Sequence, residues 1–160
     1  MYPIVVLGVI AAGGVWTGSN SSYTTAELAH HIKQSSARFV IAEPDRFSAI
    51  RAAGDLCGIP EKNYWIFDNL PDQRVPQGYR SWRQLLWRGQ TDWVRITDLE
   101  TAQNTTALRL FSSGTTGLPK AANISHYNLI AQHITVNDYK PRKHEVSVQS
   151  GFLRSHSGMS

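Results

Sequence analysis

The segment from residue 107 to residue 125 constrains the fold more tightly than any other part of the chain. It begins with Ala107-Leu-Arg-Leu-Phe111, in which the apolar residues at 108 and 110 share one face of an extended strand. Residues 121–125 have a second extended pattern, and the stretch between the two patterns is rich in Ser, Thr and Gly, which are typical of turns. We therefore expect a strand, a loop and a second strand here.

The loop contains residue types that suit an anion. Four hydroxyl side chains, two glycines and one lysine are the candidate ligand contacts: Ser112, Ser113, Gly114, Thr115, Thr116, Gly117 and Lys120. Glycines allow close backbone approach, successive backbone N–H groups can form a concave anion site, and a lysine ammonium is a point charge that suits phosphate. The spacing is not that of the P-loop, whose lysine opens a helix. A plain hairpin loop of the same composition is an open alternative.

Helical and extended patterns alternate before this segment. Thr24 and Glu27 have capping-box spacing at the start of a helix that we expect to reach Ser35. The continuous apolar run Phe39–Ala42 is typical of a strand buried on both faces of a parallel sheet. The remaining expected elements are helices at 44–57 and 81–88 and a strand at 64–67. This order predicts an α/β fold with a layered, mostly parallel sheet flanked by helices.

The two ends of the chain differ from the middle. Ile4–Ala12 is almost entirely apolar, which predicts a helix buried on most sides and ended by Gly13-Gly14. The apolar run is too short to span a bilayer and lacks the basic start of a signal peptide, so we expect no membrane span, with a secretory signal as a minor alternative. From Val136 onward charges are scattered without apolar periodicity. We expect a partial domain over residues 1–135 and a disordered or aberrant tail over residues 136–160.

Composition excludes some classes of partner. The net charge is only +4, and no dense Lys/Arg run with interleaved aromatic residues is present, which argues against nucleic acid. Cys57 is the single cysteine, so an internal disulfide is excluded and a reducing compartment fits. A buried filler is the expected role of Cys57, rather than a nucleophile. Three Asn-X-Ser/Thr triplets, at Asn20, Asn104 and Asn123, leave a secreted glycoprotein as the least favoured alternative.

The histidines give weaker signals. His30 and His31 are adjacent and therefore lie on different faces of the expected helix, whereas a metal pair needs a spacing of three or four residues. We expect both to be solvated. His126 falls in the first turn of a helix that Ser125 is expected to cap, close in sequence to the loop. Contact with a ligand is one possible role for His126, and a structural role is the more common one.

The loop sequence resembles a known family. Residues 112–120 match, at all nine positions, the phosphate-binding loop of the adenylate-forming enzymes, the superfamily of acyl- and aryl-CoA ligases, luciferases and peptide-synthetase adenylation domains. Four further segments follow the order seen in acid–CoA ligases: Gly8–Val15, Ser22–Leu28, Phe39–Ala42 and Ser125–Leu129. Together they are most similar to the 4-coumarate–CoA ligase branch, over residues 2–133. Ala121-Ala122 stands where Gly-Val is usual.

The resemblance implies a two-step reaction. A carboxylic acid reacts with ATP and Mg²⁺ to give an acyl-adenylate and pyrophosphate, and the thiol of CoA then takes the acyl group. It also implies that the seven loop residues named above hold the β- and γ-phosphates, with no protein nucleophile and no protein metal ligand assigned. The implied partners are the acid, ATP and CoA, in the cytoplasm or the peroxisome.

The resemblance also has limits. The chain has no Tyr-Gly-x-Thr-Glu segment, no Thr-Gly-Asp ribose-binding segment and no C-terminal domain with its catalytic lysine. We therefore expect an N-terminal-half fragment of such a ligase that is inactive alone. The alternative is a non-catalytic module that binds nucleotide or phosphate, or that mediates an interaction.

Overall fold

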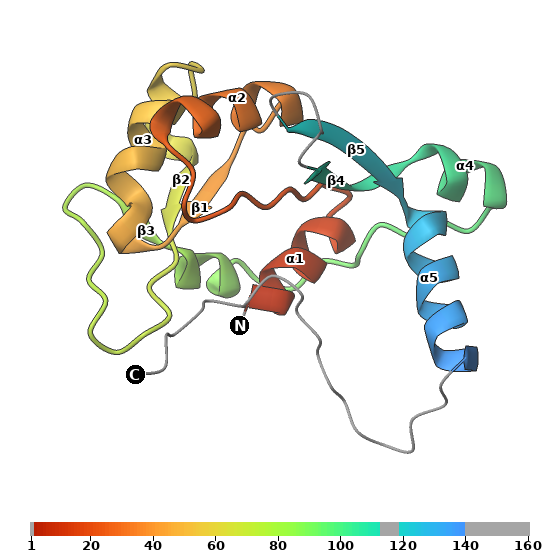
Figure 1. Cartoon of the computed structure of the whole chain (residues 1–160). Helices are drawn as coiled ribbons and strands as arrows, with labels where there is room; N and C mark the ends of the chain where they lie inside the picture. Colours follow the sequence, from red (N-terminus) through yellow and green to blue (C-terminus); the bar gives the residue numbers. More distant parts are fainter. Residues whose placement is uncertain (1, 113–118, 140–160) are drawn as a thin grey trace, which may run out of the picture.

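The computed structural model describes residues 2–112 and 119–139, and Figure 1 shows how they are arranged. The helices are α1 (Tyr2–Ala11), α2 (Thr25–Ser35), α3 (Phe47–Asp55), α4 (Leu99–Asn104) and α5 (His126–Tyr139). Short 3-10 helices are η1 (Pro44–Arg46), η2 (Glu61–Asn63) and η3 (Trp82–Trp87). The strands are β1 (Val40–Ala42), β2 (Tyr64–Ile66), β3 (Arg80–Ser81), β4 (Thr106–Ser112) and β5 (Lys120–Ser125).

The first three strands form a parallel sheet in the order β1-β2-β3. In its register Val40 pairs with Tyr64, and Trp65 pairs with Arg80. Helices α2 and α3 lie together beside this sheet (Figure 1). This arrangement confirms the predicted α/β fold with a parallel sheet flanked by helices.

A hydrophobic core joins these helices to the sheet. Leu28 and Ile32 of α2 pack in one cluster with Phe47 of α3 and with Tyr64 and Ile66 of β2. Helix α2 starts as predicted, because the Thr24 hydroxyl accepts from the Glu27 amide while the Glu27 carboxylate accepts from the Thr24 amide. The cap fixes where α2 begins, and the core fixes which face of α2 turns inward.

The last two strands form a separate antiparallel hairpin, which confirms the predicted strand, loop and strand. Its register pairs Ser112 with Lys120 and Arg109 with Asn123. Trp16 adds a single parallel bridge at Leu108. The hairpin lies beyond α2 and leads directly into α5 (Figure 1).

Two predictions about helices are wrong: the burial of the apolar helix at residues 4–12, and the α-helix at residues 81–88. Helix α1 forms and ends at Ala11, just before Gly13 with its φ of 75°, but no residue of α1 is buried, and Leu7 is 64% exposed. Residues 82–87 form a 3-10 helix, in which Trp82 is buried whereas Leu86 is exposed.

Two helices near the C-terminal end differ in extent from expectation. Helix α4 was not predicted, because its six residues are too few to show a period, although Asp98 caps it by accepting from the Thr101 amide at 2.8 Å. Helix α5 continues to Tyr139, past the predicted boundary at residue 135. Of the tail predicted at 136–160, residues 136–139 belong to α5 and residues 140–160 lie outside the described residues. Within residues 2–112 and 119–139, no helix has both the length and the apolar content needed to cross a bilayer.

We predict that Gly54→Ala destabilises the chain. A Cβ at position 54 would overlap the hydroxyl of Tyr64, which is 1% exposed, and would lie 2.8 Å from its Cζ atom. Helix propensity alone favours alanine by about 1 kcal/mol, but overpacking against a buried ring costs about 1–3 kcal/mol. Urea denaturation should show a lower free energy of unfolding. The same substitution should cost less in a Tyr64→Phe background, and an equal cost in both backgrounds would contradict this explanation.

Candidate functional site

The candidate site is the loop end of the β4–β5 hairpin, where the segment between the two strands begins and ends, and we use the term hairpin mouth for Phe111, Ser112, Pro119 and Lys120. Ser112 and Lys120 are exposed and stand opposite each other in the antiparallel register. Directly paired residues of an antiparallel ladder have their side chains on the same face. A hydroxyl and an ammonium therefore share one face of the mouth. The other predicted site residues, Ser113, Gly114, Thr115, Thr116 and Gly117, lie outside the described residues.

The opposite face of the hairpin packs on α2. Side chains alternate along a strand, so Arg109 and Phe111 lie on the face away from Ser112. Phe111 stacks on the ring of His31, with centroids 3.9 Å apart and an interplanar angle of 28°. Arg109 donates to the backbone carbonyl of Ser35 at 2.7 Å and to the side-chain carbonyl of Asn123 at 2.8 Å. Helix α2 thus packs against one face of the hairpin, and the side chains of Ser112 and Lys120 lie on the face that points away from α2.

His31 is buried, contrary to the expectation that it is solvated. It is 5% exposed, and its Nε2 lies 3.0 Å from the hydroxyl oxygen of Thr17. Its Nδ1 has no hydrogen-bond partner among the described residues. Burial, with a smaller contribution from the neighbouring His30, lowers the pKa of His31 to about 4. The ring is therefore neutral at ordinary pH.

His30 is half-buried and contacts the other strand of the mouth. Its Nε2 lies 3.3 Å from the carbonyl oxygen of Pro119. Because a carbonyl oxygen only accepts, Nε2 is the donor in this hydrogen bond. Proline has no N–H of its own, so the carbonyl is the backbone group through which Pro119 forms hydrogen bonds.

Helix α5 begins at the far end of the hairpin from the mouth. Ser125 caps it as predicted: the Asn128 amide donates to the Ser125 hydroxyl at 3.2 Å, and the hydroxyl donates to the Asn128 side chain. His126 follows β5, and at roughly 3.4 Å per residue the strand separates it from Lys120 by about 20 Å. The hairpin does not bring His126 to the mouth.

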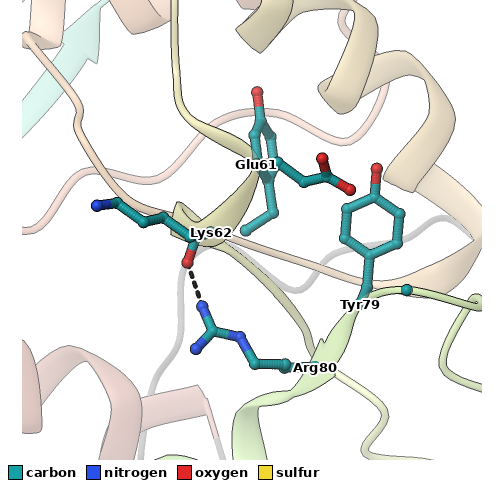
Figure 2. Close-up of a pocket in the computed structure, with 6 residues that line it drawn as sticks. Glu61, Lys62, Tyr79 and Arg80 are labelled. Carbon is teal, nitrogen blue, oxygen red and sulfur yellow. Dashed lines mark hydrogen bonds between the residues drawn. The ribbon is translucent and has the colours of Figure 1, made fainter.

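A cavity of about 350 Å³ lies elsewhere, beside β2 and β3. Its lining residues are Glu61, Lys62, Tyr64, Gly78, Tyr79 and Arg80, and none of these belongs to the hairpin (Figure 2). The guanidinium of Arg80 is already engaged by the Lys62 carbonyl and by the face of the Trp65 ring. This cavity presents the acidic Glu61 beside an engaged arginine and the exposed Lys62, whereas the four residues of the mouth include the exposed Lys120 and no acidic side chain. The mouth is therefore the better candidate for a phosphate.

The contacts of Arg109 were not predicted from the sequence. It sits between two leucines in a strand, and the period of two places it with Ala107 and Phe111. Ala107 is fully buried, so this face is an inner one. The alternation could have shown that Arg109 faces inward. No sequence signal could have shown that it meets a carbonyl 74 residues away.

The fold and the hairpin define a class of protein. The family of AMP-binding enzymes matches residues 1–153. The chain therefore belongs to the AMP-binding enzyme family, and the predicted resemblance to the adenylate-forming ligases is confirmed.

Relatives narrow this class further. The acyl-CoA ligase azaF from Aspergillus niger is 44% identical over 147 residues, which are 91% of this chain and 28% of that protein. The phenylacetyl-CoA ligase epaB, also from Aspergillus niger, is 44% identical and is covered to 27%. The crystal structure of ATP-bound MatB from Rhodopseudomonas palustris superposes with a TM-score of 0.62 at 26% identity, over 85% of this chain and 24% of that one. The chain spans about a quarter of the length of the proteins that it matches.

We predict that the buried neutral His31 makes stability depend on pH. The unfolded histidine takes up a proton near pH 6.5, whereas the folded one does so near pH 4. Between these values the unfolded state binds more protons, so the free energy of unfolding falls as the pH falls, by about 3 kcal/mol over the full interval. Urea denaturation at several pH values measures this slope. His31→Phe keeps a ring against Phe111 but cannot titrate, so its slope should be smaller; equal slopes would refute the prediction.

Proposed function

We propose that this chain supplies the phosphate-binding part of an ATP-dependent acid–CoA ligase. The observation that carries the proposal is the register that sets Ser112 opposite Lys120, on an exposed face, at the mouth of a hairpin in a chain of the AMP-binding family. The proposed ligand contacts are Ser112, Ser113, Gly114, Thr115, Thr116, Gly117 and Lys120. We propose that residues 1–135, with the rest of α5, belong to a partial AMP-binding domain.

The chemistry of such a site is the neutralisation of charge. In the proposed first step a carboxylate oxygen attacks the α-phosphorus of ATP, the bond from that phosphorus to the oxygen bridging it to the β-phosphorus breaks, and pyrophosphate leaves with the electron pair. The ammonium of Lys120 and the hydroxyl of Ser112 are donors for the β- and γ-phosphate oxygens, on which that charge accumulates. In the second step the CoA thiolate takes the acyl group, and AMP leaves.

Magnesium fits this site as part of the nucleotide. Among residues 2–112 and 119–139, no group of three or more His, Cys, Asp or Glu side chains is placed to hold a metal ion. Mg²⁺ commonly binds through substrate phosphates and water, with few protein ligands. We therefore propose that Mg²⁺ arrives with ATP and shares the neutralisation of the phosphates with Lys120.

The names of the relatives support a proposal for the substrate class. The named activities of the two fungal relatives, acyl-CoA and phenylacetyl-CoA ligase, and the resemblance to the 4-coumarate–CoA ligase branch support a small carboxylic acid, with an aryl acid preferred. Because this chain spans about a quarter of those proteins, the acid, CoA and the complete reaction are proposed for a protein of family length. We place the activity inside the cell, in the cytoplasm or the peroxisome.

We predict that Lys120→Ala weakens the binding of pyrophosphate and of ATP-Mg²⁺ by about tenfold to a hundredfold, because it removes a charge-assisted contact of about 1.5–3 kcal/mol. Isothermal titration of the purified chain measures both affinities. Lys62→Ala is the matched control, since it removes an equally charged exposed lysine that lines the other cavity. Equal losses in the two variants would show that only net charge matters, and a larger loss for Lys62→Ala would move the site to that cavity.

An activity assay on the same purified chain tests whether it is an inactive part of a ligase or a non-catalytic module that binds phosphate. We expect the 160-residue chain to bind pyrophosphate without releasing it from ATP when it is supplied with aromatic and fatty acids. Robust pyrophosphate release would contradict the expectation that the chain is inactive alone. Absence of any affinity for pyrophosphate or ATP in the wild type would exclude both the phosphate site and the phosphate-binding module.

A further inference from the structure

We infer that His30 and His31 are positioning residues that hold the two strands of the hairpin mouth on α2, and thereby set where Ser112 and Lys120 present their side chains. The ligand side of this inference rests on the proposed function. The structural side rests on contacts among described residues alone.

The two histidines contact different strands of the mouth. His31 stacks on Phe111, the residue before Ser112 on β4. His30 donates to the carbonyl of Pro119, the residue before Lys120 at the start of β5. Neighbouring residues of an α-helix point about 100° apart, so one turn of α2 can reach both strands at once. Helix α2 therefore contacts both strands at the mouth and helps to set the spacing between them.

The anchor leaves the ligand face free. His31 packs on the Phe111 face of the hairpin, and the Ser112 and Lys120 side chains lie on the opposite face. The His30 hydrogen bond uses a backbone carbonyl and no ligand-binding side chain. Both contacts can thus persist while an anion occupies the mouth.

The anchoring helix is itself held in place. The ring of His31 is buried and forms a hydrogen bond with the hydroxyl of Thr17, and the capping box fixes the start of α2. Arg109 ties the last turn of α2 to β4 through the carbonyl of Ser35. These contacts fix the backbone from which Ser112 and Lys120 project, and a misplacement of 1 Å can lower a rate by about a hundredfold.

The test compares His30→Ala with His30→Gln, which restores a side-chain N–H donor, and with His133→Ala, which removes an exposed histidine of α5. His30 is only half-buried, so we expect all three to fold with similar unfolding midpoints. Two quantities are measured: amide hydrogen exchange of the ligand-free chain at residues 111, 112, 120 and 121, and the dissociation constant for inorganic pyrophosphate.

We predict that His30→Ala raises exchange at the mouth by about tenfold, with no change in β1 and β2, and weakens pyrophosphate binding by about tenfold. His30→Gln should recover most of both effects, and His133→Ala should show neither. Unchanged exchange at the mouth in His30→Ala would overturn the anchor whether or not any ligand binds.

The two arms separate this inference from the proposed function. If the wild type binds pyrophosphate and His30→Ala binds it equally well despite faster exchange, the histidine does not position the site and the inference fails. If the wild type does not bind pyrophosphate, the proposed function fails, while the exchange arm still decides whether α2 anchors the mouth. His31→Phe, which keeps the stacked ring, should leave mouth exchange near the wild-type level, and a tenfold rise there would also count against the anchor.

Discussion

The antiparallel register of β4 and β5 is the constraint on which the rest of the site depends. Side chains alternate between faces, so a slip of one residue would turn Phe111 and Arg109 away from α2 and turn the Ser112 side of the strand toward it. Arg109 pairs with Asn123 in this register, and the two side chains also share a hydrogen bond. The hydrogen bond from Arg109 to the Ser35 carbonyl holds the same strand on α2, beside the contacts made by His30 and His31. Arg109 therefore contributes both to the pairing of the strands and to the choice of the face that packs on α2.

Helix α2 connects this hairpin to the parallel sheet. Leu28 and Ile32 are buried in the core with α3 and β2, and each apolar side chain of this size contributes about 1.5–3 kcal/mol when it is buried. A hydrogen bond such as that from His30 to the Pro119 carbonyl contributes about 1 kcal/mol. The core therefore decides where α2 lies, and the polar contacts decide how the hairpin sits on it. The position of Lys120 is therefore determined by residues that are not themselves proposed to contact phosphate.

The sequence predicted local features well because local physics controls them. The capping box at Thr24, the helix stop at Gly13 and the Ser125 cap each depend on residues within one turn. The alternation of helices and strands and the turn composition at residues 112–120 were sufficient to predict the layered sheet and the hairpin.

Other features depend on contacts between residues that are far apart in sequence. His30 meets Pro119 across 89 positions, and no local pattern shows which of two adjacent histidines is buried. The exposure of α1 was missed for the same reason, because an apolar sequence cannot reveal whether a partner covers it. Within the candidate site, the sequence predicted Ser112 and Lys120 as ligand contacts but gave no indication of the helix beneath them.

The two cations of the hairpin illustrate a division of labour that their chemistry explains. Arg109 carries a planar, always-charged guanidinium with several fixed donors, which suits it to bind a backbone carbonyl and an asparagine at the same time. Lys120 carries a compact charge on a flexible stem and is exposed. In the proposed function, the phosphate chain changes shape as pyrophosphate departs and needs a donor that can follow it, whereas a strand register needs donors that do not move. Exchanging the two residue types should therefore weaken both the proposed phosphate contact and the strand register, even though the net charge of the hairpin would stay the same.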